Sequence, residues 1–294
     1  MLLIAAALLG VGPAQLGEMV SGVFFKRPAA AAIAPTPSHT DATLQARLQT
    51  IGGGMSSGHL AAAAIDLQSG ATAAVDTSRT YPAASLFKLP ILMQVLAEED
   101  AGLLDPERQV EIRPEDWTDG SGVLQARVGD HLSIRELTRL MIEQSDNIAA
   151  LVLLDVVGVS GTNATVQQLG LSQTRVVDHR AGEPGDHTTS AADMVYLLLE
   201  LATGQAINQR VSEQALSLLE AKQSVNWLRD DLPFWVKVAH KWGDLPDARH
   251  DAGIVFTPRG SYVVVVLTQD AEPDEAASAI ARVSRSVYDY LGNR

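Results

Sequence analysis

The order of strand-like and helix-like apolar patterns along the chain limits the folds open to it. Five segments have strand patterns, two before the middle of the chain and three after it: residues 60–67, 71–76, 235–241, 253–256 and 261–268. The intervening stretch, about residues 85–222, is mainly helical in pattern. This order predicts an α+β fold in which one antiparallel sheet is assembled from both chain ends and an all-helical subdomain is inserted into it.

Local signals refine this prediction. Gln68-Ser69-Gly70 between the first two strand segments indicates a hairpin. Ser133 and Glu136 have the spacing of a capping box at the start of a helix. Terminal helices at residues 42–51 and 274–291 would flank the sheet and cover one face. A cleft between the sheet and the helical insert is then the natural place for a functional site.

The N-terminal region differs in composition from the rest of the chain. Residues 1–23 are mostly apolar but interrupted by glycines, and Lys26 and Arg27 precede an Ala/Pro-rich run. We interpret residues 1–40 as a signal or anchor segment with a linker, and residues 41–294 as the catalytic domain. The alternatives are an ordinary amphipathic helix, or a start codon placed inside a longer anchor. An export segment would place the domain outside the cytoplasm, either secreted, periplasmic or anchored on the outer face of the membrane.

Composition excludes several classes of function. The net charge of −13, without a Lys/Arg-rich run, makes a nucleic-acid partner implausible. The absence of cysteine excludes disulfides, thiolate metal sites and a cysteine nucleophile. The seven histidines lack the spacing of zinc ligands. We therefore expect a small-molecule partner and neither a metal nor a cofactor.

Candidate chemistry begins at Ser85 and Lys88, where a segment with helical apolar spacing starts. Residues at i and i+3 share a helix face, so the lysine is expected beside the serine hydroxyl. A serine needs such a base to become a nucleophile, and burial would lower the lysine pKa toward that task. Taken alone, this spacing also fits a capping serine and a solvated lysine.

Two further motifs follow in order. Ser145-Asp146-Asn147 lies between two predicted helices, and Lys241-Trp242-Gly243 lies on a predicted strand. Each is unremarkable by itself, because Ser, Asp and Asn are common helix caps. The glycine would let a substrate approach the backbone closely.

Together, S-x-x-K, S-D-N and K-x-G make the chain similar to class A β-lactamases and penicillin-binding proteins. The resemblance extends over about residues 42–294. It implies that Ser85 forms an acyl-enzyme, that Lys88 helps to deprotonate it, and that Ser145 passes a proton to the leaving nitrogen. It also implies that Asn147 and Lys241 bind the substrate amide and carboxylate. The backbone N–H groups of Ser85 and Asp244 would form the oxyanion hole.

Two positions depart from the family pattern. Trp242 stands where the family has a threonine or serine whose hydroxyl helps to hold a substrate carboxylate, and Asp244 adds a negative charge beside it. Both changes disfavour a standard penicillin carboxylate. Gly243 itself is retained as part of the substrate-binding strand.

A further departure from the family pattern concerns the residue expected to drive deacylation. Class A β-lactamases use a glutamate on an omega loop, and Glu183 is the candidate here. The loop is much shortened, and His187 stands where the family has an asparagine. Glu183 is either the water-activating base or a solvated loop carboxylate.

We expect a serine hydrolase that acts through an acyl-enzyme, most simply on β-lactams or a related peptidoglycan-like substrate. One alternative is a penicillin-binding, D,D-peptidase-like enzyme that releases its adduct slowly. The other is a non-enzymatic binding module that retains the fold, although such a module would have no need for the complete set of motifs.

Overall fold

The computed structural model of the chain describes residues 39–292. The signal or anchor segment predicted for residues 1–40 lies almost wholly outside the described residues, as do the last two residues of the predicted domain. Within residues 39–292, no single helix is both long and apolar enough to cross a membrane; one pair of helices meets that test only together, across an 85° bend.

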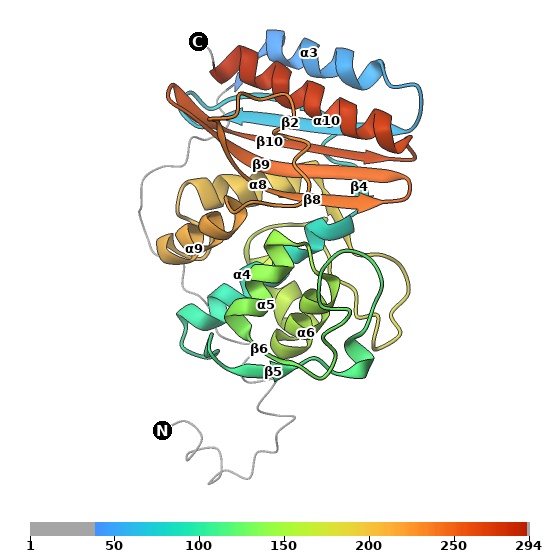
Figure 1. Cartoon of the computed structure of the whole chain (residues 1–294). Coiled ribbons are helices and arrows are strands. Elements are labelled where there is room, and N and C mark those ends of the chain that lie inside the picture. The colour runs from blue at the N-terminus through green and yellow to red at the C-terminus, as the bar shows by residue number, and fades with distance from the viewer. Residues whose placement is uncertain (1–38, 293–294) are drawn as a thin grey trace. The chain divides into compact units, whose positions relative to one another are not determined.

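A six-stranded sheet has the strand order β1-β3-β2-β10-β9-β8 (Figure 1). Its strands come from both ends of the domain: β1 (His39–Thr40), β2 (His59–Asp66), β3 (Ala71–Val75), β8 (Lys237–Leu245), β9 (Ala248–Thr257) and β10 (Gly260–Gln269). The sheet is antiparallel, as predicted, except that β1 pairs parallel with β3. The sequence did not reveal β1 because two residues carry no periodicity. The predicted hairpin is confirmed as β2–β3.

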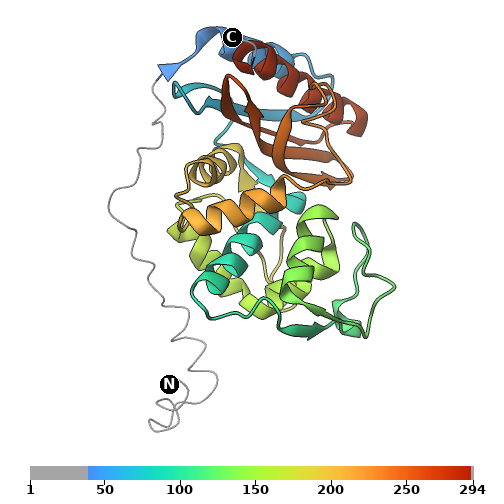
Figure 2. The same cartoon turned by 60° about the vertical axis from the view of Figure 1, so that its left-hand side comes forward.

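Alternation along the strands divides the core into two layers. On β2, Ala62 and Ala64 belong to an outer cluster, whereas Ala61 and Ile65 belong to an inner one. The outer cluster is covered by α3 (Ala42–Gly53) and α10 (Pro273–Val287), which lie side by side on one face of the sheet (Figures 1 and 2). The predicted role of the terminal helices is thereby confirmed.

The inner face carries the inserted helical part (Figure 2). Its helices are η1 (Ala84–Phe87), α4 (Lys88–Asp100), η2 (Pro114–Asp116), α5 (Ile134–Glu143), α6 (Asn147–Val157), α7 (Val159–Gln168), α8 (Ala191–Ala202) and α9 (Gln209–Leu219). Two short antiparallel ribbons accompany them: β4 (Thr80–Pro82) with β7 (Thr188–Ser190), and β5 (Gln109–Glu111) with β6 (His131–Ser133).

Helix ends follow the sequence closely. Ser133 caps α5 by accepting a hydrogen bond from the Glu136 N–H at 3.2 Å, as the capping-box spacing predicts. Asp41 caps α3, and it also accepts a hydrogen bond from the Tyr290 hydroxyl at 2.7 Å. The cap of the first helix therefore also ties α3 to the C-terminal end of the domain.

Candidate active site

Ser85 and Lys88 lie at the junction of η1 and α4, beside β8. The serine is on a 3₁₀ turn rather than in the first turn of the α-helix, and in such a turn residues i and i+3 eclipse each other. Lys88 Nζ is 3.0 Å from Ser85 Oγ. Ala84, directly before the serine, has a left-handed backbone with φ of 44°. A strained non-glycine residue at this point is typical of functional turns.

Lys88 is fully buried, and its amine meets more acceptors than Ser85 alone. The carbonyl oxygen of Ser145 and Asn147 Oδ1, at 2.7 Å, both accept hydrogen bonds from it, and Ser145 Oγ lies 3.1 Å away. Burial, and then the nearby charge of Lys241, hold the pKa of Lys88 well below its ordinary value. A neutral amine has two N–H groups, which the carbonyl and the amide oxygen occupy. Its lone pair is then left for a hydroxyl proton, as a base requires.

Ser145 lies in the turn between α5 and α6 and has a left-handed φ of 51°. Asp146 caps α6 through the Ala149 N–H at 2.9 Å, and its other oxygen accepts the N–H groups of Val123 and Leu124. Asn147 donates from Nδ2 to the Asp119 carbonyl at 3.0 Å. These hydrogen bonds fix the turn to the loop of residues 119–124. The turn thereby presents Ser145 Oγ to both lysines.

Lys241 reaches the same hydroxyl from β8. Its Nζ is 3.0 Å from Ser145 Oγ and 2.9 Å from the carbonyl oxygen of Trp242. The side chain is fully buried, and this burial lowers its pKa to about 7. Gly243 allows the strand to approach the nucleophile: a Cβ there would lie 2.9 Å from Ala84 Cβ and 3.1 Å from Ser85 N. The predicted residues of all three motifs thus lie together.

Trp242 is 4% exposed. Strand alternation places it on the face opposite Lys241, with Val238 of the outer cluster. Because β8 is an edge strand, its ring still lies 4.6 Å from Lys241 Nζ, and it meets Trp227 edge-to-face at 6.1 Å. Asp244 is partly exposed and forms an ion pair with Arg249.

None of the described contacts of Glu183 involves Lys88 or Lys241. Its carboxylate accepts hydrogen bonds from Arg175 Nη2 at 3.1 Å and from the Asp178 N–H at 3.0 Å, both within its own loop. Its role as a base stays a prediction.

His187, at the end of the same loop, is a residue whose contacts the sequence did not reveal. Its ring stacks on Phe87 at 4.1 Å, and its carbonyl accepts the Ala83 N–H at 2.7 Å. Its Nδ1 accepts the Val177 N–H at 2.9 Å, so the neutral ring carries its proton on Nε2. Burial first, then the charges of His179 and Lys88, lower its pKa to about 4. A signal was present, since His187 directly precedes the strand that pairs with β4.

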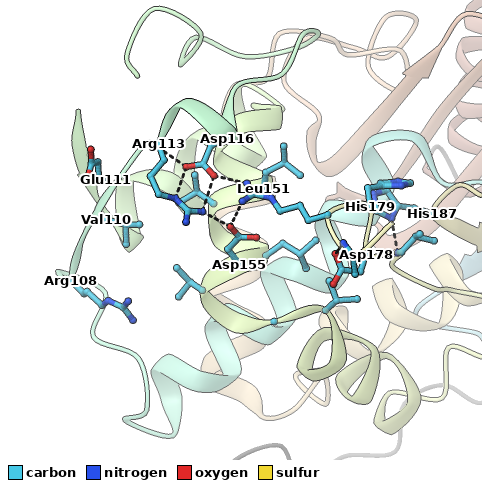
Figure 3. A pocket seen from close by; sticks show the side chains of 18 residues that line it. Arg108, Val110, Glu111, Arg113, Asp116, Leu151, Asp155, Asp178, His179 and His187 are labelled. Atoms are coloured by element: carbon cyan, nitrogen blue, oxygen red, sulfur yellow. Dashed lines mark hydrogen bonds and ion pairs between the residues drawn. The ribbon is translucent and has the colours of Figure 1, made fainter. Parts of the chain in front are cut away.

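Behind this loop lies a cavity of about 660 Å³ (Figure 3). One wall is a network of two arginines and two aspartates. Arg180 of the loop contacts buried Asp116, and its Nη1 lies 2.6 Å from Asp155. Arg113 contacts the same two carboxylates at 3.1 and 2.6 Å. Asp116 is fully buried and paired, so the loop is held to η2 and α6 by hydrogen-bonded charges.

Comparison with known proteins identifies the same family that the three motifs indicate. Residues 43–291 match the family described as the beta-lactamase enzyme family. The chain belongs to this family. Among solved structures, it is similar to a beta-lactamase from Sphaerobacter thermophilus, with 25% identity over 86% of this chain and 98% of that one, and a TM-score of 0.78. An ancestral class A beta-lactamase gives 28% identity over 84% and 99%, with a TM-score of 0.77.

Solved structures of PBP-A are as similar to this chain as those of the beta-lactamases. A mutant of PBP-A, solved as an acyl-enzyme complex with penicillin G, gives 27% identity over 88% of this chain and all of that one, with a TM-score of 0.81. The beta-lactamase fold predicted from the sequence is therefore confirmed. The chain is a serine hydrolase of the beta-lactamase family, and its structural relatives include both beta-lactamases and PBP-A.

Proposed function

We propose that this family member opens the amide bond of β-lactams by forming an acyl-enzyme on Ser85. The observation that carries the proposal is the position of Lys88, which is buried, 3.0 Å from Ser85 Oγ, and already donating to two obligate acceptors. Its lone pair takes the serine proton as Oγ attacks the carbonyl carbon.

The remaining steps use Ser145 and Lys241. Ser145 Oγ lies between the two lysine Nζ atoms, at 3.1 and 3.0 Å. It passes a proton to the leaving nitrogen and recovers it from the lysine pair. The N–H groups of Ser85 and Asp244 stabilise the tetrahedral oxyanion, and the close approach of Gly243 to Ser85 supports their convergence.

Release of the acyl group is expected to be slower than its formation. The Glu183 carboxylate is held by Arg175 and Asp178 of its own loop. These contacts support the interpretation of Glu183 as a loop carboxylate over its interpretation as a catalytic base. The second candidate function, a penicillin-binding enzyme of the D,D-peptidase type, draws on the same observation and on the similarity to PBP-A.

Intact-protein mass spectrometry after exposure to benzylpenicillin tests both candidates. We expect one adduct, absent from Ser85→Ala, that decays slowly in wild-type protein. A chromogenic cephalosporin measures the turnover in parallel. Rapid turnover without a detectable adduct would support an efficient β-lactamase. An adduct that persists in Ser85→Ala would reject Ser85 as the nucleophile.

The N-terminal segment bears on location. We propose, from its apolar sequence and its Ala/Pro-rich linker, that residues 1–40 deliver the domain to the outer side of the membrane. Fractionation of cells that express the full chain, with and without residues 1–36, measures this directly.

A further inference from the structure

The cations at the β8 end of the site are already engaged with partners. An ammonium has three N–H groups. Those of Lys241 meet Ser145 Oγ at 3.0 Å, the carbonyl oxygen of Trp242 at 2.9 Å and the face of the Trp242 ring at 4.6 Å. The last is a cation–π contact within the usual range. A bound carboxylate would find no unoccupied donor on this side chain.

Arg249, on the neighbouring strand, also has partners of its own, which it contacts through Nη1 and through the face of its guanidinium. Its Nη1 contacts the Asp244 carboxylate and donates to the Leu245 carbonyl at 3.1 Å. Its guanidinium lies 5.3 Å from the centre of the Trp227 ring. Since Trp227 packs against Trp242, the two indoles stand between two cations. Together these four side chains, Lys241, Trp242, Trp227 and Arg249, form what we call the indole stack.

The surface beside the indole stack is negative or apolar. Asp244 leaves 41% of its side chain exposed, whereas the Trp242 ring is buried and its indole N–H has no partner among the described residues. A carboxylate placed here would lose its hydration, face the Asp244 charge and gain no unoccupied donor from Lys241. Such burial of an unpaired charge is strongly unfavourable.

We propose that the indole stack makes this site selective for acyl donors whose leaving side carries no free carboxylate, with Trp242 as the specificity-determining residue. This inference rests on the proposed acylation of Ser85. It defines the substrate class as esterified or amidated at the position where a penicillin has its acid. A neutral leaving group would need no cation on this side of the site.

A matched pair of compounds tests this selectivity: benzylpenicillin and its methyl ester. The readout is the ratio of their second-order rate constants for acylating Ser85, measured by intact mass. In wild-type protein we expect a ratio of acid to ester at or below one. Trp242→Thr should raise the ratio ~10–100-fold, because it returns a hydroxyl and frees a Lys241 donor for the charged group.

Two other variants complete the design. Asp244→Asn, at a partly exposed side chain, releases Arg249 and should also raise the ratio, which keeps the test decisive if Trp242→Thr does not fold. Trp235→Thr is the matched control: this tryptophan is 62% exposed and meets Phe234 edge-to-face, so its loss should leave the ratio unchanged.

The inference is overturned if wild-type protein prefers the acid, or if neither Trp242→Thr nor Asp244→Asn raises the ratio. Hippurylthioglycolic acid and its methyl ester repeat the comparison without a β-lactam ring. If only this pair acylates Ser85, the proposed β-lactam activity fails while the selectivity is still measured. If neither pair reacts, both proposals fall.

Discussion

Replacing Gly243 by alanine should push strand β8 away from the turn that carries Ser85. The added Cβ would lie 2.9 Å from Ala84 Cβ and 3.1 Å from Ser85 N. Carbon atoms in contact sit at ~3.5–4.0 Å, so β8 and the Ser85 turn must separate by about 0.6 Å or more. Catalytic groups lose efficiency beyond ~0.5 Å of displacement. Because the shift moves the Ser85 and Asp244 N–H groups apart, we expect acylation to slow by ~10²-fold, comparable to losing one oxyanion donor.

The assay is the second-order rate of Ser85 labelling by a fluorophosphonate or a penicillin, with thermal unfolding measured beside it. Overpacking at this position should also cost about 1–3 kcal/mol of stability. Gly253→Ala is the matched control. A Cβ at Gly253 would overlap Ala239 O at 2.7 Å and His240 Cβ at 2.7 Å, inside the sheet and away from the nucleophile. It should destabilise the fold but spare the labelling rate of folded protein. Equal labelling rates for Gly243→Ala and wild type would refute the reasoning.

Three further perturbations follow from the structure. Since burial lowers the pKa of Lys241 to about 7, its ammonium is lost as the pH rises through 7; acylation should fall there, and Lys241→Arg should remove this alkaline decline in a pH–rate profile. Glu183→Gln should slow adduct decay far less than the ~10²–10⁴-fold expected for a lost base, because the carboxylate contacts Arg175; a trapped adduct in the mass spectrum would reject this. A chain starting at residue 37 should melt like full-length protein, whereas one starting at Thr43 loses β1 as well as the Asp41 cap, and the cap alone contributes about 0.5–2 kcal/mol; identical melting of the two would contradict the capping argument.

Much of the fold could be predicted because it depends on periodic patterns. Strand alternation and the Ser133 cap both led to the observed elements. The boundaries at β8 and β9 were less accurate: β9 (Ala248–Thr257) was predicted only at residues 253–256. Its first half contains polar residues that the sheet buries, such as Asp251, which lies 2.8 Å from His240 on β8. A buried, hydrogen-bonded pair of polar side chains disrupts the apolar pattern on which the prediction depends.

The candidate site, like the fold, could be predicted only in part. The resemblance to class A β-lactamases implied that Ser85, Lys88, Ser145 and Lys241 share one site, because the three motifs occur in the order typical of that family. It did not show that Trp242 would reach the Lys241 ammonium, since alternation assigns them opposite faces and only the edge position of β8 lets them meet. The contacts of Glu183 likewise depend on the folded loop and not on its sequence spacing.

Ala84 and Ser145 hold left-handed backbone angles where the chain could have used glycine. Each such angle costs an alanine or serine of order 1–3 kcal/mol. Laboratory evolution for heat tolerance would therefore tend to relax these two positions first, through glycine or asparagine. Replacing Ala84 would loosen the turn that presents Ser85, and replacing Ser145 would remove the hydroxyl that lies between the two lysines. Thermostable descendants of this protein should accordingly divide into two groups: those that keep both strained residues and gain stability elsewhere, and those that relax them and lose activity.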